Sequence, residues 1–105
     1  MAAVDINNQQ FDELISGDKP VLVEFWAPWC SYCRRIGPAY DKVAEREDIL
    51  AVKVNIDEAP QLASREHIDV IPTLVLYRGG QALGSIVAPE SKARIDAFLR
   101  ETLSK

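Results

Sequence analysis

The stretch EFWAPWCSYCRR, residues 24–35, contains the only two cysteines of the chain, Cys30 and Cys33. It overlaps the segment VLVEFW, residues 21–26, which is apolar on both faces apart from the carboxylate of Glu24, as is typical of a central strand covered on both sides. From Cys30 onward, apolar side chains recur at the spacing of a helix. The sequence therefore places both cysteines at the start of a helix that follows a buried strand.

The position of Cys30 favours a reactive thiolate. At the start of a helix, unpaired backbone N–H groups and the positive end of the helix dipole stabilise an anion, and the thiolate is the nucleophilic form of cysteine. We therefore expect Cys30 to attack, and Arg34 and Arg35 add positive charge nearby. Cys33 lies one turn further along the same helix face, shielded by the chain, where it can attack a mixed disulfide formed at Cys30.

A Cys-x-x-Cys motif taken alone is also compatible with half of a zinc site or with two small buried side chains. A structural zinc site takes four ligands, and beyond the two cysteines the chain offers a single histidine, His67, which we expect on the surface of the helix opened by Pro60. A disulfide that closes so small a loop also constrains the unfolded chain little, which argues against a purely structural role. We therefore predict no metal site and favour redox chemistry.

The remaining sequence alternates strand and helix patterns. Asn7 with Gln10 forms a capping box, Ser91 is typical of an N-cap, and Gly79-Gly80 indicates a hairpin turn. The expected elements are, in order, a strand at 4–6, a helix ending at Gly17, a strand at 21–26, a helix from Cys30 to about Glu47 that contains Pro38, a strand at 50–56, a short helix from Pro60, a hairpin with strands at 73–77 and 82–87, and a helix from Ser91. This order predicts an α/β fold, one domain over residues 1–105 with a single mixed five-stranded sheet and helices on both faces.

The composition argues against several classes of function. With 105 residues, 48% hydrophobic and 27% charged, the chain resembles an ordinary soluble globular protein and has no apolar run long enough to span a membrane. The formal net charge is −4 and no basic cluster exceeds the pair Arg34-Arg35, so we expect no nucleic-acid partner. The N-terminus, residues 1–13, lacks the basic and apolar regions of a secretory signal, so we expect a cytoplasmic location.

Five motifs together resemble the thioredoxin family over essentially the whole chain. They are FWAPWC leading into the cysteine pair, the proline after Ile36-Gly37, KVNID at 53–57, IPT at 71–73 and the RGG of the hairpin. The resemblance implies the thioredoxin fold and protein dithiol-disulfide oxidoreductase activity with no bound cofactor. It also implies disulfide-containing proteins as partners, a thioredoxin-reductase-like electron donor and a monomeric chain.

The same resemblance implies roles for individual residues. Cys30 is implied to attack and Cys33 to resolve, and Pro72 to be a cis proline that faces them. Glu24 resembles the buried acid of the family, which exchanges protons with the resolving cysteine, and Lys53 on the neighbouring strand is its expected partner. Burial raises the pKa of such a carboxyl. The groove in which a substrate chain docks is implied to be bordered by Trp29, Tyr32, Ile71, Pro72 and Ala88.

Between the cysteines the chain departs from the family, since Ser31-Tyr32 replaces the usual Gly-Pro. The backbone N–H gained at position 32 and the tyrosine hydroxyl are both expected to stabilise the Cys30 thiolate, which makes the disulfide easier to reduce. We therefore predict a redox couple more oxidising than that of a typical thioredoxin. Glu24, where thioredoxins usually have Asp, and Pro28 favour the same conclusion, because both resemble disulfide isomerase domains.

Three other functions fit parts of the sequence. A disulfide isomerase or oxidase role would follow from a more oxidising couple. An iron-sulfur cluster that bridges two subunits accompanies a Ser-Tyr dipeptide in some glutaredoxins, and one chain would supply only part of its four thiolates. An interaction module with an idle site is less favoured, because both cysteines, Glu24, Trp29 and Pro72 are in place.

Overall fold

The computed structural model describes residues 3–105, and the predicted absence of a secretory signal partly concerns Met1 and Ala2, which lie outside this range. In chain order the elements are β1 (Val4–Asp5), α1 (Asn8–Ile15), β2 (Val21–Trp26), α2 (Ser31–Val43), β3 (Leu50–Asn55), α3 (Pro60–Arg65), β4 (Thr73–Arg78), β5 (Gln81–Val87) and α4 (Lys92–Leu103). This is the order of strands and helices that the sequence predicts.

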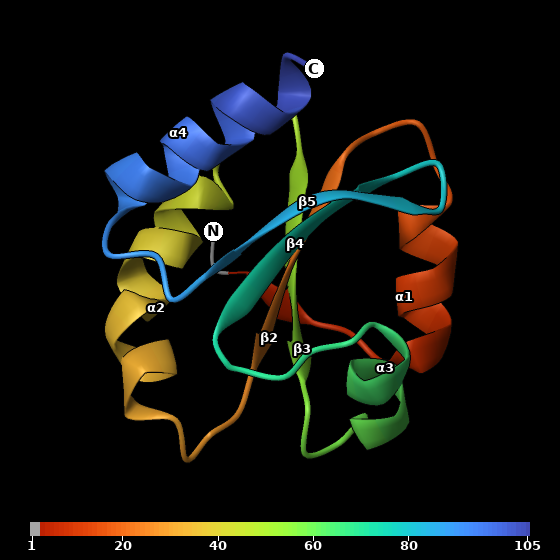
Figure 1. Ribbon diagram of the computed structural model, residues 1–105, viewed down its shortest axis with the longest axis vertical. Coiled ribbons are helices and arrows are strands. Elements are labelled where there is room, and N and C mark those ends of the chain that lie inside the picture. Colours follow the sequence, from red (N-terminus) through yellow and green to blue (C-terminus); the bar gives the residue numbers. More distant parts are fainter. Residues whose placement is uncertain (1–2) are drawn as a thin grey trace.

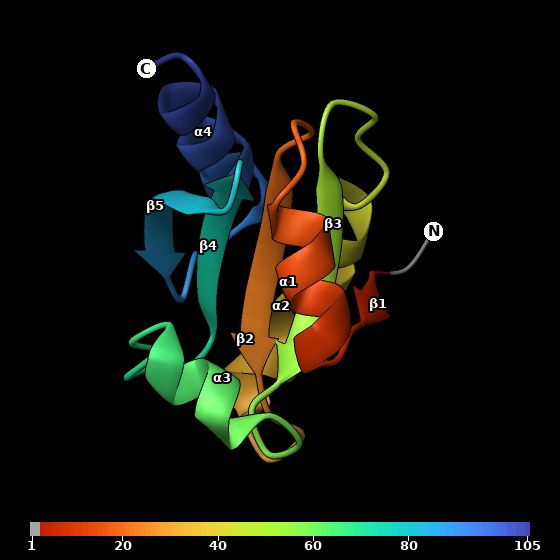
Figure 2. The same ribbon diagram turned by 90° about the vertical axis from the view of Figure 1, so that its right-hand side faces the viewer.

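The strands form one five-stranded sheet in the order β1-β3-β2-β4-β5. Strands β1 and β2 run parallel to β3, whereas β4 runs antiparallel to both β2 and β5. Helices α2 and α4 lie on one face of the sheet, and α1 and α3 lie on the other (Figures 1 and 2). The predicted mixed sheet with helices on both faces is therefore confirmed, and β2 is its central strand.

The central strand β2 contributes to two hydrophobic cores because its side chains alternate between the faces of the sheet. Val23 and Phe25 pack in the core on the α1 and α3 side, and Leu22 packs in the core on the α2 and α4 side. Glu24 has the same parity as Leu22, so its side chain points toward α2. There it is buried, with 2% of its surface exposed.

Side chains cap the helices where the sequence predicts. The Asn7 side chain accepts the Gln10 backbone N–H while the Gln10 side chain accepts the Asn7 N–H, each at 2.9 Å, which completes the capping box. Ser91 accepts the Arg94 N–H at the start of α4. At the start of α2 the capping atom is the sulfur of Cys30, so the capping position of this helix is also its first cysteine.

Two local predictions were wrong. The helix that begins after Cys30 ends at Val43 and not near Glu47, because the N–H groups of Glu45 and Arg46 bond to the carbonyls three residues earlier and tighten the chain into turns. His67 lies beyond the end of α3, exposed and with a positive φ of 60°, and not on the helix surface. Neither difference moves the cysteine pair.

Candidate active site

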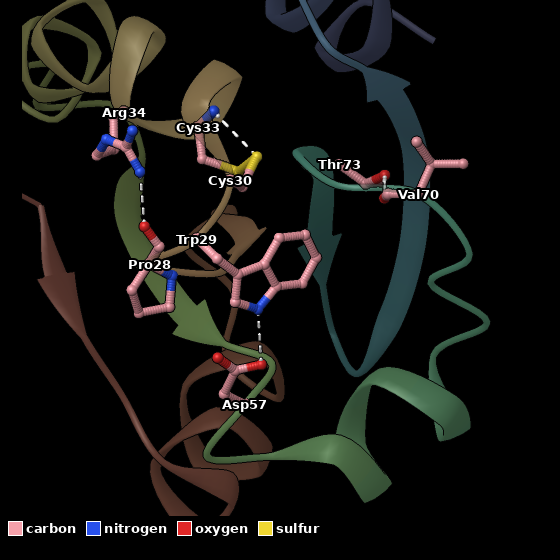
Figure 3. The surroundings of a disulfide bond; sticks show 8 residues. All are labelled: Pro28, Trp29, Cys30, Cys33, Arg34, Asp57, Val70 and Thr73. Atoms are coloured by element: carbon pink, nitrogen blue, oxygen red, sulfur yellow. Dashed lines mark hydrogen bonds between the residues drawn. A yellow bond between two sulfur atoms is a disulfide. The ribbon is translucent and has the colours of Figure 1, made fainter.

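Cys30 and Cys33 form a disulfide at the start of α2, immediately after the loop that follows the central strand β2. The sulfur of Cys30 accepts a hydrogen bond from the backbone N–H of Cys33 at 3.1 Å, as Figure 3 shows. A donor aimed at this sulfur stabilises negative charge on it, as do the other unpaired N–H groups of a helix N-terminus. The two cysteines are 8% and 4% exposed, so Cys30 is the slightly more accessible of the two.

The loop before Cys30 is held by two side-chain hydrogen bonds. Trp29 donates its indole N–H to the carboxylate of Asp57 at 3.2 Å, and Arg34 donates to the carbonyl of Pro28 at 2.8 Å. Figure 3 shows the indole between the disulfide and Asp57. Because 65% of Trp29 remains exposed, the ring presents an apolar surface to solvent beside Cys30.

The two arginines that follow the cysteines each contact a group other than the sulfur. The guanidinium of Arg34 is engaged with the Pro28 carbonyl, and that of Arg35 lies 5.5 Å from the centre of the Tyr32 ring. Their positive charge therefore reaches Cys30 only as a general field, which water screens.

The peptide bond between Ile71 and Pro72 is cis, as the resemblance implies. The carbonyl of Pro72 accepts the N–H of Ala88 at 2.9 Å, which fixes the β5–α4 loop, residues 88–91, beside the proline. Ala88 has a φ of 45°, in the left-handed region that favours glycine. The chain therefore keeps the loop conformation that suits glycine although it carries alanine there.

The Tyr32 hydroxyl does not point to the sulfur. Its oxygen lies 3.1 Å from the carbonyl oxygens of both Ala88 and Pro89, to which it donates. This corrects the expectation that the hydroxyl stabilises the Cys30 thiolate. A phenol has a single proton to donate, and here that proton is hydrogen-bonded to carbonyl oxygens. Tyr32 instead joins the residue pair between the cysteines to the β5–α4 loop.

Glu24 and Cys33 line the same cavity of about 130 Å³, whose wall also includes the residues Trp26, Arg34, Gly37, Tyr40, Asp41 and Lys53. Burial raises the pKa of Glu24 to about 7, and the Lys53 charge opposes this rise while Asp5 and Asp41 add to it. One carboxylate oxygen of Glu24 has no hydrogen-bond partner among the described residues. A carboxyl whose pKa burial raises to about 7 thus shares a cavity with the second cysteine.

Lys53, the expected partner of Glu24, forms its ion pair with Asp5 and acts on Glu24 by its charge. Lys53 and Glu24 are cross-strand partners on β3 and β2, but the Lys53 ammonium lies 3.9 Å from the carboxylate of Asp5 and 4.7 Å from the centre of the Trp26 ring. The lysine therefore acts on Glu24 only through its charge. The physical reason is that an ammonium loses less hydration at the rim of the cavity than beside a buried carboxyl.

Comparison with known proteins decides the family. The thioredoxin family model matches residues 2–101. Thioredoxin 1 of Nostoc sp. is 41% identical over 105 residues, with 97% of this chain and 98% of that protein covered. The chain belongs to the thioredoxin family. The thioredoxin of Alicyclobacillus acidocaldarius is 36% identical, with 97% of this chain and 99% of that protein covered.

Solved thioredoxin structures share the fold. The thioredoxin of Malassezia sympodialis superposes with a TM-score of 0.86 at 30% identity, covering 96% of this chain and 90% of that one. Mitochondrial thioredoxin 3 of Saccharomyces cerevisiae gives a TM-score of 0.83 at 26% identity, with 94% of each chain covered. With its Cys30–Cys33 pair, this member of the thioredoxin family is a thiol-disulfide oxidoreductase.

Two kinds of feature do not occur in the part of this thioredoxin-family chain that the structure describes. Within residues 3–105, no three or more His, Cys, Asp or Glu side chains are grouped so that they could hold a metal ion. In the same range, no helix has both the length and the apolar character needed to cross a bilayer.

Three residues of the site were not predicted. Asp5 and Asp41 act on Glu24 through their charge, and Asp57 binds the indole of Trp29. Asp57 stands in the KVNID motif, so the resemblance to thioredoxins could have identified it. Asp5 lies on a two-residue edge strand, which is too short to show a pattern of burial, and Asp41 resembles any polar residue of an amphipathic helix.

Proposed function

We propose that this chain is a general protein dithiol-disulfide oxidoreductase in which Cys30 attacks, Cys33 resolves and Glu24 exchanges the proton of Cys33. The observation that carries the proposal is that Glu24 and Cys33 line one small cavity behind a disulfide at the N-terminus of α2. The helix start favours the thiolate form of one cysteine, and the cavity supplies an acid or base for the other.

The reaction consists of two exchange steps. In the reduced protein, the Cys30 thiolate attacks one sulfur of a substrate disulfide, forms a mixed disulfide and releases the other substrate sulfur as a thiolate. Cys33 then loses its proton to Glu24 and attacks Cys30, which forms the Cys30–Cys33 disulfide and releases the second substrate thiolate. Two electrons pass from the cysteine pair to the substrate. In the opposite direction, Glu24 returns the proton to Cys33.

The environment of Glu24 suits it to this proton exchange. A general acid or base is most effective when its pKa lies near the working pH, and that of Glu24 is raised to about 7 by burial. The cavity that joins it to Cys33, about 130 Å³, has room for water that could relay the proton. One carboxylate oxygen of Glu24 has no hydrogen-bond partner among the described residues, and a water in this cavity would supply one.

A substrate chain would dock between Trp29 and the cis proline, in contact with Ile71, Pro72 and Ala88. Support comes from the exposed apolar surface beside Cys30, since Trp29 is 65% and Val70 54% exposed. Figure 3 shows Trp29 next to the disulfide, and Val70 on a separate segment to the right of it. Tyr32 would contribute indirectly, by holding the β5–α4 loop in place.

We further propose that the redox couple is more oxidising than that of a typical thioredoxin. The group expected to stabilise the Cys30 thiolate is the backbone N–H that Tyr32 has and proline lacks, because the Tyr32 hydroxyl is bound to loop carbonyls. The proposed partners are disulfide-containing proteins and a thioredoxin-reductase-like electron donor. The single domain, the monomeric state, the cytoplasmic location, the isomerase or oxidase role and the iron-sulfur alternative stay predictions of the sequence.

Trapping of the mixed disulfide tests the roles of the two cysteines. We expect the unaltered chain to reduce insulin in the presence of dithiothreitol. Cys33→Ser should accumulate a mixed disulfide with insulin at Cys30, because the resolving thiol is missing, and mass spectrometry would locate it. Cys30→Ser should neither reduce insulin nor form the adduct. An adduct at Cys33 in the Cys30→Ser protein, at the rate seen for Cys33→Ser, would contradict the assignment.

A further inference from the structure

Three charged side chains form a row across neighbouring parallel strands. Asp5 on β1 is the cross-strand partner of Lys53 on β3, and Lys53 is in turn the partner of Glu24 on β2. Because directly paired residues in a sheet project from the same face, the lysine stands between two carboxyl groups. One of them, Glu24, is buried, and the other, Asp5, has 45% of its side chain exposed.

Asp5 holds two groups at the rim of the Glu24 cavity. One of its oxygens accepts the indole N–H of Trp26 at 2.6 Å, and the other lies 3.9 Å from the Lys53 ammonium. The ammonium in turn lies 4.7 Å from the centre of the Trp26 ring, within the range of a cation–π contact. Trp26 and Lys53 both line the cavity that contains Glu24.

Lys53 lies between two carboxyl groups, those of Glu24 and Asp5, and hydration decides which one its ammonium contacts. If the ammonium turned toward Glu24, it would gain a closer opposite charge but lose hydration inside a cavity that is mostly enclosed by protein. Asp5 offers an opposite charge at the rim, where the lysine stays 26% exposed. Without the Asp5 charge, the nearest carboxylate across the strand pair would be that of Glu24.

We propose that Asp5 is a positioning residue of the redox site: it holds Lys53 and Trp26 at the rim of the cavity and thereby keeps the lysine from pairing with Glu24. This inference rests on the proposed role of Glu24 as the group that exchanges a proton with Cys33. Its consequence is that Glu24 stays able both to take and to give a proton at neutral pH, which a carboxylate paired with lysine does not do.

Other charged and titratable groups also face Glu24. Arg34 and Asp41 from α2 line the same cavity, and Tyr40, also from α2, donates its hydroxyl proton to backbone carbonyls. Asp41 is itself bound to the backbone N–H of Ala3, and Arg34 to the Pro28 carbonyl. In agreement with the geometry, Lys53 lowers the pKa of Glu24 while Asp5 and Asp41 raise it. Asp5 is the carboxylate that also contacts the lysine.

A titration of the Glu24 carboxyl by ¹³C NMR in the oxidised protein tests the proposal, because no cysteine thiol titrates in that form. Asp5→Asn should lower the Glu24 midpoint by roughly 1 unit, since the lysine is freed to approach. Asp12→Asn is the matched control: it removes the same charge from an exposed pair with Arg65 and should leave the midpoint unchanged. No shift in Asp5→Asn, or equal shifts in both variants, would overturn the proposal.

A double-mutant comparison separates positioning by Asp5 from the direct effect of its charge. In a Lys53→Gln background there is no ammonium to release, so Asp5→Asn should shift the Glu24 midpoint by less than half as much as in the unaltered protein. An equal shift in both backgrounds would show that Asp5 acts by its charge alone and would overturn the positioning role. Asp5→Glu, which keeps the charge near Lys53, should restore most of the original midpoint.

These titrations do not depend on the role of Glu24 in catalysis. If Glu24 were not the proton-exchanging group, exchange kinetics of Glu24→Gln would reveal it, and the midpoint shift in Asp5→Asn would still be measurable. Conversely, an unmoved midpoint in Asp5→Asn would remove Asp5 from the site and leave the proposed function of Glu24 in place.

Discussion

The Tyr32 hydroxyl lies 3.1 Å from the carbonyl oxygen of Ala88, so the residue pair between the two cysteines is tied to the β5–α4 loop. The same loop is bound on its other side to the cis proline, through the Ala88 N–H and the Pro72 carbonyl. One loop is thus hydrogen-bonded both to the start of α2 and to the cis-proline segment. Tyr32 stands where thioredoxins usually carry proline, which has no group that could make this contact.

Tyr32→Phe should loosen this connection without changing the redox chemistry. The loss of the hydroxyl leaves loop carbonyls without a donor and should lower the free energy of unfolding by about 1 kcal/mol. The reduction potential should hardly move, because the hydroxyl does not contact the sulfur. Urea unfolding and equilibration with glutathione measure the two quantities. A potential lowered by roughly 30 mV, equivalent to about 1.4 kcal/mol, would mean that the hydroxyl does act on the thiolate.

Ala88→Gly should stabilise the protein. Alanine with a φ of 45° is strained in a way that glycine is not, and relief of the strain exceeds the entropy that glycine adds to the unfolded chain. We expect a gain of roughly 0.5–1 kcal/mol in urea unfolding. Ala97→Gly, inside α4, is the matched control and should lose about 1 kcal/mol. A loss at both positions would show that the loop does not strain Ala88.

Stability should decrease with pH because of Glu24. Its pKa is raised from 4.5 to about 7 in the folded protein, so the folded state holds this proton more tightly than the unfolded state does. The stabilisation is complete below about pH 4.5 and is lost as the pH rises toward 7, with a total of up to about 3 kcal/mol. Urea unfolding at several pH values would measure it. In Glu24→Gln this loss should be absent, whereas Glu13→Gln, on the exposed side of α1, should retain it.

The sequence was sufficient for features that depend on local patterns. The capping residues Asn7 and Ser91, the hairpin at Gly79-Gly80 and the central strand β2 all follow from spacing and residue type. The burial of Glu24 followed from the apolar residues around it in β2. The cis bond before Pro72 followed only from the resemblance to thioredoxins, because most X–Pro bonds in folded proteins are trans.

Side-chain directions could not be predicted in the same way. Lys53 had two carboxylates within reach across the sheet, and which one it contacts depends on hydration at the cavity rim. The Tyr32 hydroxyl had a choice between a sulfur close in sequence and carbonyls 56 and 57 residues away, and only the folded chain brings those carbonyls near. The left-handed φ of Ala88 could not be predicted from the residue itself, since alanine rarely adopts it; only the resemblance to thioredoxins, which usually carry glycine at this position, pointed to it.

The redox potential should respond to the backbone at position 32. We expect the chain to equilibrate with glutathione at a potential above the reference value for thioredoxin, roughly −270 mV, and toward that of protein disulfide isomerase, roughly −180 mV. Tyr32→Pro removes the N–H and should lower the potential, whereas Tyr32→Phe keeps it and should not. A value at or below the thioredoxin reference in the unaltered chain would contradict the proposed oxidising character.

The most direct test of the account is the rate at which the reduced protein reduces a protein disulfide in a single turnover at pH 7, compared between the unaltered chain and Glu24→Gln. If Glu24 takes the proton of Cys33, the substitution should slow release of the reduced substrate by tenfold or more and abolish the rise in rate with pH near 7. Glu13→Gln should react at the normal rate. Equal rates and equal pH profiles for Glu24→Gln and the unaltered chain would contradict the central role of Glu24.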